Sequence, residues 1–303
     1  MIESFLLTTA AVARGLPRVR GVGRFGNRLT QRLLSSFSNP AVLVSMRDGT
    51  RMKIDLRSPT EADTLWTGDY DKPLLTLLKR CIRPGDTVAD IGANVGLVTI
   101  ALGAHLRRSD IDGRLLAFEP VPTNFQRLAE NIVANGLDNH VRAYEYGLGD
   151  AAEDVQIVLE NRGGASTGNA YVFNGSADRD AGQQFTIRLR RLDDEAQSVG
   201  IDRLNVIKVD IEGAEVMFLR GAMSTITLYR PVILGEFNAY FMKKFGDSIL
   251  EAEKLLNPLG YRPFLMSRRG LTPTLQAIDG LRDGMENVAF LPGDRLDIAN
   301  GLE

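Results

Sequence analysis

The sequence predicts an α/β fold in which helices cover both faces of a mostly parallel sheet. From residue 87 onward, apolar strand-like runs alternate with amphipathic helical segments. A turn of small residues, Gly92 to Gly96, follows the first of these strands, and Glu119 follows the second. The carboxyl ends of parallel strands lie at one edge of a sheet, so we expect the turn and Glu119 to border one ligand crevice.

The apolar pattern assigns each element of this fold in turn. Strands of the main sheet are predicted at residues 87–91, 114–118, 141–146, 205–209 and 231–235. Helices are predicted at residues 71–83, 95–106, 124–135, 214–219 and 248–256. Two further strands, at residues 261–266 and 287–291, are expected to close the sheet as an antiparallel pair.

Two segments depart from this alternation. Residues 155–159 and 185–189 each alternate apolar and polar side chains, so we expect a hairpin added to the main sheet. Residues 161–184 between them are rich in glycine, serine, asparagine and aspartate, and are expected to form a surface loop or a lid. After the hairpin, Asp193 and Asp194 are expected to cap the helix that follows them.

Residues 1–58 are expected to form an extension that precedes the main domain, residues 59–303. An amphipathic helix with a basic flank is predicted in it from Phe25, Leu29, Leu33 and Phe37 beside Arg24, Arg28 and Arg32. Such a helix packs on the main domain, our preferred interpretation, or contacts a membrane surface or a partner protein. Strand-like runs on both sides of Asp48-Gly49 predict a hairpin.

The composition is that of a globular protein, with 44% hydrophobic and 24% charged residues. The net charge of −2 gives no overall electrostatic footprint for nucleic acid, although residues 1–47 hold seven arginines and one acid. The apolar run at residues 5–13 is too short to span a bilayer. The single cysteine, Cys81, cannot form an internal disulfide. We therefore expect a soluble, cytoplasmic protein.

The turn after Asp90 and the carboxylate of Glu119 together define the expected ligand. Gly92 lets a ligand approach the backbone, because a side chain there would fill the ligand's space. The G-x-x-x-G spacing differs from the G-x-G-x-x-G turn of dinucleotide sites. Glu119 is placed to accept hydrogen bonds from the two hydroxyls of a ribose. A ligand with a ribose, an adenine and a zwitterionic tail but no pyrophosphate is therefore expected, and S-adenosylmethionine meets these conditions.

More carboxylates follow the later strands. Asp210 and Glu236 end two predicted strands and are expected to face the crevice, while Glu212 and Glu215 are expected to open a helix, whose dipole favours acids there. A hydroxyl acceptor must lose its proton as the methyl group arrives. Asp210 and Glu236 are the catalytic candidates, as base and orienting partner. They could equally hold a divalent cation, which we favour less because further ligands are not identified.

At these residues the chain resembles the FkbM family of methyltransferases. The matching stretches are Trp66…Gly68…Tyr70, Asp90-Ile91-Gly92-Ala93-Asn94-Val95-Gly96, Phe118-Glu119-Pro120 with Asn131, Leu192-Asp193-Asp194, Lys208-Val209-Asp210-Ile211-Glu212-Gly213-Ala214-Glu215 and Pro231…Glu236. The resemblance implies a class I, Rossmann-like methyltransferase fold with a seven-stranded sheet. It also implies S-adenosylmethionine as cofactor and O-methylation, often of sugars or secondary metabolites. The complete expected cofactor site is Asp90, Gly92, Ala93, Asn94, Gly96, Glu119, Pro120 and Asp210.

Other interpretations stay open. An RNA methyltransferase, for example of tRNA, shares the core fold and would suit the basic N-terminal arm, but not the acidic main domain. A nicotinamide-dependent dehydrogenase would need the tighter glycine pattern, and a non-catalytic relative would bind the cofactor as a structural element. Trp66 and Tyr70 are expected mainly as packing residues, with stacking on a sugar as the alternative. His105 and His140 are expected on the amino-terminal side of the sheet, away from the site.

Overall fold

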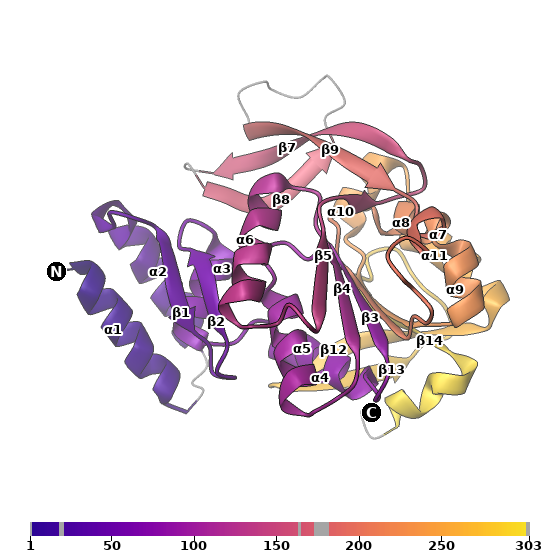
Figure 1. Cartoon of the computed structure of the whole chain (residues 1–303), viewed down its shortest axis with the longest axis horizontal. Helices are drawn as coiled ribbons and strands as arrows, with labels where there is room; N and C mark the ends of the chain where they lie inside the picture. Colours follow the sequence, from indigo (N-terminus) through magenta and orange to yellow (C-terminus); the bar gives the residue numbers. More distant parts are fainter. Residues whose placement is uncertain (1, 18–20, 163–164, 173–181, 301–303) are drawn as a thin grey trace.

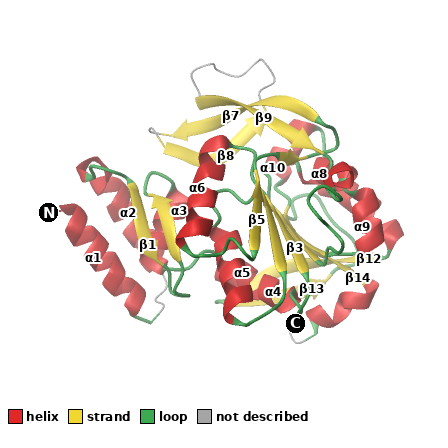
Figure 2. Cartoon of the chain, in the orientation of Figure 1, coloured by secondary structure: helices red, strands yellow, loops and turns green. Residues whose placement is uncertain are grey.

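The computed structural model describes residues 2–17, 21–162, 165–172 and 182–300. One large twisted sheet with helices on both faces lies at its centre (Figure 1, Figure 2). A unit of helices and a two-stranded hairpin lies at the N-terminal end of the molecule, on the left of Figure 1. A second, four-stranded sheet lies above the main sheet in the same view.

The main sheet has the strand order β13-β12-β14-β11-β10-β3-β4-β5. Its strands are β3 (Thr87–Ile91), β4 (Arg114–Phe118), β5 (Val141–Tyr144), β10 (Val206–Val209), β11 (Val232–Glu236), β12 (Tyr261–Arg269), β13 (Thr272–Ala277) and β14 (Asn287–Pro292). The strands from β11 to β5 are parallel, and β14 is antiparallel to both neighbours. The predicted class I methyltransferase fold is confirmed. The sheet has eight strands instead of seven because β13 pairs with the outer edge of β12.

Two hydrophobic cores, one on each face of the sheet, hold the helices in place. The helices of the main domain are α4 (Lys72–Cys81), α5 (Leu97–Arg108), α6 (Pro122–Ala134), α7 (Leu192–Glu195), α8 (Glu215–Gly221), α9 (Met223–Tyr229), α10 (Ala239–Met242) and α11 (Ile249–Leu256). Leu115 of β4 packs in the core beneath α4, α5 and α6, and Leu116 packs in the core beneath α8, α9 and α11. A strand buried on both faces reads as a continuous apolar run, which is why these strands could be predicted.

The predicted hairpin belongs to a separate sheet, which corrects the expectation that it would extend the main one. Strands β6 (Gly147–Leu148), β7 (Glu153–Arg162), β8 (Ala165–Val172) and β9 (Gly182–Arg190) have the order β6-β9-β7-β8. Ile157 of β7 and Ile187 of β9 pack on Val121, so the apolar side of the hairpin is buried at the end of the main sheet and not at its edge. Strand β8 lies inside the stretch predicted as a loop or lid, of which residues 163–164 and 173–181 lie outside the described residues.

The N-terminal unit consists of α1 (Ile2–Gly15), α2 (Val22–Leu33), β1 (Ala41–Ser45), β2 (Arg51–Asp55) and α3 (Pro59–Thr67). The predicted amphipathic helix is present as α2, but its fully buried side consists of small residues instead of the apolar stripe. A β-carbon at Gly26 would come within 2.2 Å of the Trp66 ring, and Trp66 Nε1 donates a hydrogen bond to Thr30 Oγ1 (2.9 Å). Phe25 is left 72% exposed. Trp66 is therefore a packing residue of this unit.

Asn131 of α6 joins the N-terminal unit to the main domain. Its Oδ1 accepts a hydrogen bond from Lys53 N of β2 (2.7 Å), and its Nδ2 donates to Val95 O in the turn after β3 (2.9 Å). The side chain is completely buried. One residue therefore fixes the hairpin, α6 and the glycine turn relative to one another, while the domain boundary after residue 58 stays a prediction.

We expect Asn131→Ala to lower the free energy of unfolding by about 1–3 kcal/mol, because it removes the hydrogen-bond partners of the buried Val95 carbonyl and of the partly buried Lys53 amide. Asn135→Ala on the same helix is the matched control, since Asn135 makes equivalent hydrogen bonds to Arg51 from a more exposed position. Urea denaturation of both variants measures the difference. Equal losses would show that burial of the Asn131 hydrogen bonds is not what matters.

Candidate active site

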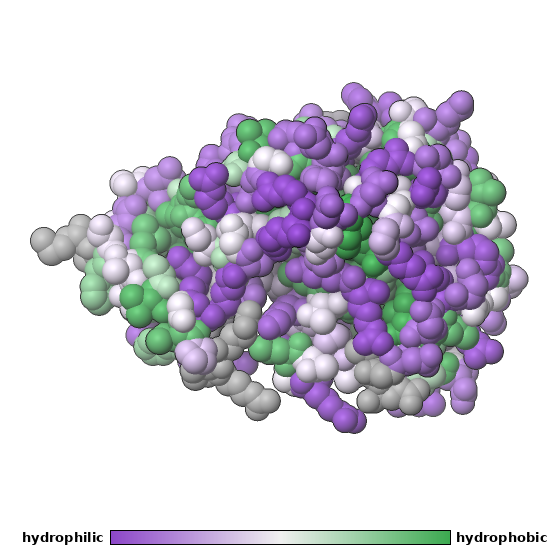
Figure 3. All heavy atoms as spheres, turned by 60° about the horizontal axis from the view of Figure 1, so that its bottom comes forward, coloured by the Kyte–Doolittle hydropathy of each residue, from purple (hydrophilic) through white to green (hydrophobic). Residues whose placement is uncertain are grey.

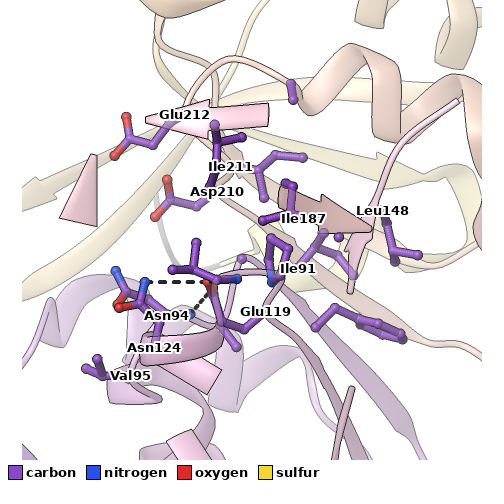
Figure 4. A pocket seen from close by; sticks show the side chains of 18 of the residues that line it. Ile91, Asn94, Val95, Glu119, Asn124, Leu148, Ile187, Asp210, Ile211 and Glu212 are labelled. Carbon is purple, nitrogen blue, oxygen red and sulfur yellow. Dashed lines mark hydrogen bonds between the residues drawn. The ribbon is translucent and has the colours of Figure 1, made fainter. Parts of the chain in front are cut away.

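A cavity of about 530 Å³ opens at the carboxyl ends of β3, β4 and β10. The turns that follow these strands, the loop between β2 and α3, and the apolar side of β7 and β9 enclose it. Figure 4 shows Asn94, Glu119 and Asn124 close together, with Asp210 and Glu212 at a separate position on the wall. A cavity therefore lies where the sequence places the crevice.

Most of the expected cofactor residues lie on this cavity. Those that line it are Gly92, Ala93, Asn94, Glu119, Pro120 and Asp210. Asp90 and Gly96 are not among the lining residues. Asp90 is completely buried behind the turn, and Gly96 precedes the first residue of α5. Both residues can therefore act on a ligand only through the backbone that they position.

The two glycines of the turn are required by neighbouring parts of the protein, which corrects our reason for Gly92. A β-carbon at Gly92 would lie 2.1 Å from Asp210 O, and one at Gly96 would lie 2.7 Å from Leu128 Cδ1. Both residues also have positive φ angles, +76° and +94°, which favour glycine. The turn thus packs directly against the end of β10, and this packing brings Asp210 next to the turn.

Glu119 is held at the end of β4 by three donors. Its Oε2 accepts a hydrogen bond from Asn94 N (2.8 Å), and its Oε1 accepts bonds from Val121 N (3.0 Å) and Asn124 Nδ2 (3.4 Å) (Figure 4). The residue is only 4% exposed, and this burial raises the pKa of Glu119 to about 7 although the three donors act in the opposite direction. A carboxylate has about four acceptor positions, so capacity for a ribose hydroxyl remains.

Lys208 is a site residue that our sequence reasoning did not single out. Its Nζ lies 3.1 Å from Asp90 Oδ1 and 3.9 Å from Asp210 Oδ2, and it donates a hydrogen bond to Gly92 O (2.9 Å). Burial opposes the charged amine, but Asp90 and Asp210 outweigh it, so the pKa of Lys208 is raised. Thr99 Oγ1 donates to the second oxygen of Asp90 (2.6 Å). The available signal was a lysine inside an otherwise apolar strand.

Glu212 and Glu215, which we expected to open one helix together, have different positions. Helix α8 begins at Glu215, whose Oε1 accepts hydrogen bonds from Ile211 N (3.0 Å) and Gly213 N (3.1 Å). Glu212 precedes the helix with a φ angle of +53° and lines the cavity. Burial, with Asp210 and Glu236 nearby, raises the pKa of Glu212 to about 7. The expected helix role therefore holds for Glu215 but not for Glu212.

Glu236 is the last residue of β11, the strand next to β10, so it comes from the strand end that adjoins Asp210. Glu236 is exposed as a whole residue and is not among the residues that line the cavity. Partial desolvation of its carboxyl group and the nearby charge of Asp210 raise its pKa. Tyr70 lines the cavity, and burial together with Asp210 raises the pKa of its hydroxyl. Asp210, Glu236 and Tyr70 thus lie near enough to influence one another electrostatically.

The remaining candidate residues lie elsewhere. His105 and His140 do not line the cavity. We predicted that Asp193 would cap the helix directly after it. Asp193 instead accepts hydrogen bonds from Ser224 N (3.0 Å) and Thr225 N (2.8 Å), so it caps the start of α9. Within the described ranges, no group of three or more histidine, cysteine, aspartate or glutamate residues is arranged to hold a metal ion.

Comparison with known protein families gives one family match. The profile of the methyltransferase FkbM domain matches residues 90–263, more than half of the chain. The matched region extends from Asp90 through Glu119, Lys208 and Asp210 to the first residues of β12. It therefore contains every strand-end residue described above, while Tyr70, which lies between α3 and α4, precedes it.

Individual relatives match about half of the chain or somewhat more. The hexuronic acid methyltransferase AglP of Haloferax volcanii is 25% identical over 185 residues, covering 61% of this chain and 70% of AglP. The 31-O-demethyl-FK506 methyltransferase FkbM of Streptomyces tacrolimicus is 28% identical, covering 46% of this chain and 60% of that protein. Ribosomal RNA small subunit methyltransferase G of Mycolicibacterium vanbaalenii is 29% identical, covering 49% of this chain and 64% of that protein. The chain thus spans less than two thirds of the last two relatives.

Removal of the Lys208 amine alone is expected to destabilise the fold strongly. Lys208→Met leaves the Asp90 carboxylate buried without its cation, and such a change costs about 3–5 kcal/mol. The double variant Lys208→Met/Asp90→Asn is expected to recover at least half of that loss, because neither charge remains. Chemical denaturation measures all three proteins, with Lys53→Met in the exposed Lys53–Glu130 pair as the control. Additive effects of the two substitutions would contradict a coupled pair.

The buried carboxylates predict that the ligand-free fold loses stability as the pH rises. Burial raises the pKa values of Glu119 and Glu215 from 4.5 to about 7 in the folded chain. The folded chain then binds more protons than the unfolded chain, so this stabilisation is complete below about pH 4.5 and is lost as the pH rises through about 7. Thermal unfolding at pH values between these two limits measures how steeply the stability falls as the pH rises. Glu215→Gln should reduce it, and an unchanged slope would contradict the assignment.

Proposed function

The chain belongs to the FkbM family of methyltransferases, and we propose that it transfers the methyl group of S-adenosylmethionine to a hydroxyl group of a sugar, glycoconjugate or secondary metabolite. The observation that carries this proposal is the buried Glu119 carboxylate, which shares one cavity with the turn at residues 92–94 and with Asp210. Two relatives are named for a sugar acid and for an O-demethylated compound. These names support an oxygen acceptor.

The residues of the cavity fit the cofactor. Glu119 would accept hydrogen bonds from the ribose hydroxyls, and the turn at residues 92–94 together with Asp210 would hold the amino-acid tail. Pro120 and Leu148 supply apolar wall on which an adenine can rest. Asp90 acts through Lys208, which fixes the Gly92 carbonyl and therefore the shape of the turn. When bound, S-adenosylmethionine supplies an electrophilic methyl group on a sulfonium.

Asp210 is the carboxylate we assign as general base. Its side chain is 29% exposed and lines the cavity, so a bound acceptor can reach it, and it would take the proton that the acceptor hydroxyl loses. Glu236 would orient the Asp210 carboxylate from the neighbouring strand end. Glu212 is a second candidate for this orienting role, because it lines the same cavity as Asp210. The Lys208 amine lies 3.9 Å from Asp210 Oδ2 and donates a hydrogen bond to Gly92 O, so its charge attracts the base toward the side of the cavity formed by the turn.

The charge of the cavity favours a small acceptor over RNA. Asp210, Glu212 and Glu153 line it, and carboxylates repel the phosphates of a nucleic acid. Residues 1–47 hold seven arginines and one acid, so the rest of the chain carries a net charge of about −8. The relative named for ribosomal RNA makes RNA the competing acceptor. A divalent cation is not required by this proposal, since a carboxylate base alone can accept the proton.

The proposal is tested first by cofactor binding. We expect S-adenosylhomocysteine to bind with a dissociation constant on the order of micromolar, and Glu119→Gln to weaken it about tenfold or more because a charge-assisted acceptor is lost. Isothermal titration calorimetry measures both values. Glu130→Gln is the matched control, as Glu130 is a half-buried glutamate on α6 that is not among the cavity residues. Equal affinity in wild type and Glu119→Gln would contradict the ribose assignment.

Transfer of a labelled methyl group then identifies the acceptor. The purified chain is incubated with labelled S-adenosylmethionine and with oligosaccharide, small-metabolite or ribosomal RNA pools. Label in the first two pools, lowered about a hundredfold or more by Asp210→Asn, agrees with the proposal. Label in RNA alone would replace it with the RNA alternative. Full activity in Asp210→Asn would remove Asp210 as the base.

A further inference from the structure

Helix α1 presents an uncharged, partly apolar face to solvent. Its exposed residues are Ser4, Phe5, Thr8, Thr9, Ala11, Val12 and Gly15, and none carries a charge. Phe5 and Val12 are 68% and 60% exposed, and Leu16 directly after the helix is 56% exposed. Spacings of seven and four residues place these three side chains on one face. The surface side of a helix in a globular protein normally carries charged residues, so this face lacks the usual protection from association.

The neighbouring helix α2 adds positive charge to the same end of the molecule. Arg24, Arg28 and Arg32 are exposed at spacings of four residues, and Phe25 lies exposed beside them. In the part of the chain that the structure describes, no ion pair joins these arginines to an acidic side chain. Apolar and hydrophilic surfaces lie side by side at this end in Figure 3. The only acid among residues 1–47 is Glu3, against seven arginines.

We propose that the surface formed by Phe5, Val12, Leu16, Phe25 and the three arginines docks on an anionic lipid bilayer. Large apolar side chains can enter the headgroup region, while arginines bind lipid phosphates. No helix in the described residues is long and apolar enough to cross a membrane, so this contact would be peripheral. A second copy of the chain fits less well, since a symmetric contact would bring one arginine stripe toward another. RNA would contact the arginines but would leave the exposed apolar side chains of α1 without a partner.

Vesicle binding tests this docking surface with the full chain. We expect sedimentation with vesicles of phosphatidylcholine and phosphatidylglycerol, and at least about tenfold weaker binding to phosphatidylcholine alone. Arg24→Gln/Arg28→Gln/Arg32→Gln should weaken binding to the anionic vesicles about a hundredfold. Phe5→Ser/Val12→Ser should weaken it about tenfold or more. All of these residues are exposed, so unchanged thermal unfolding is expected and shows that the variants are folded.

Matched controls lie at other surfaces of the molecule. Leu228→Ser replaces a residue of α9 that is 70% exposed, and Arg268→Gln/Arg269→Gln removes two exposed charges from β12. Neither should change vesicle binding. Equal losses in control and test variants would overturn the proposal. It would also be overturned by a dimer that Phe5→Ser/Val12→Ser dissociates without any vesicle binding, or by arginine-dependent binding to RNA but not to vesicles.

Discussion

The ion pair between Lys208 and Asp90 is the contact on which the geometry of the site depends. It joins the ends of two neighbouring parallel strands, β10 and β3, in the interior of the protein. The same amine holds the Gly92 carbonyl, and the turn that contains Gly92 places Asn94 N against the Glu119 carboxylate. The position of Glu119, at the end of β4, is therefore linked to a charge pair on the two strands that precede β4 in the sheet order, β3 and β10. A buried pair of this kind has to be complete to be tolerated.

Burial has a second effect at this edge of the sheet. Glu119, Glu212 and Glu215 all have pKa values raised to about 7, and burial is the main cause for each. A protein interior strengthens a hydrogen bond that is formed and penalises one that is missing. The site thus holds several hydrogen-bond acceptors in a buried environment. A ligand with matching hydroxyl and ammonium groups would gain the most binding free energy there. The stability of the ligand-free protein is lower as a result.

Local sequence patterns predicted those features that depend on neighbouring residues. Apolar runs gave the strands and helices of the main domain, and an acid directly after a strand gave Glu119 and Asp210. Features that depend on distant contacts were missed. The separate sheet exists because Ile157 and Ile187 pack on Val121, and α2 turns its glycines inward because of Trp66. The role of Lys208 also depends on a strand more than 100 residues earlier in the chain.

The position of β14 in the sheet has a consequence for how the chain folds during translation. It follows every other strand of the main sheet in sequence, yet it lies between β11 and β12. During translation, β11 therefore has a bare edge of unpaired amides and carbonyls until the ribosome has released residue 292. Nascent chains that stall before this point carry a strand edge open to aggregation or to capture by a chaperone.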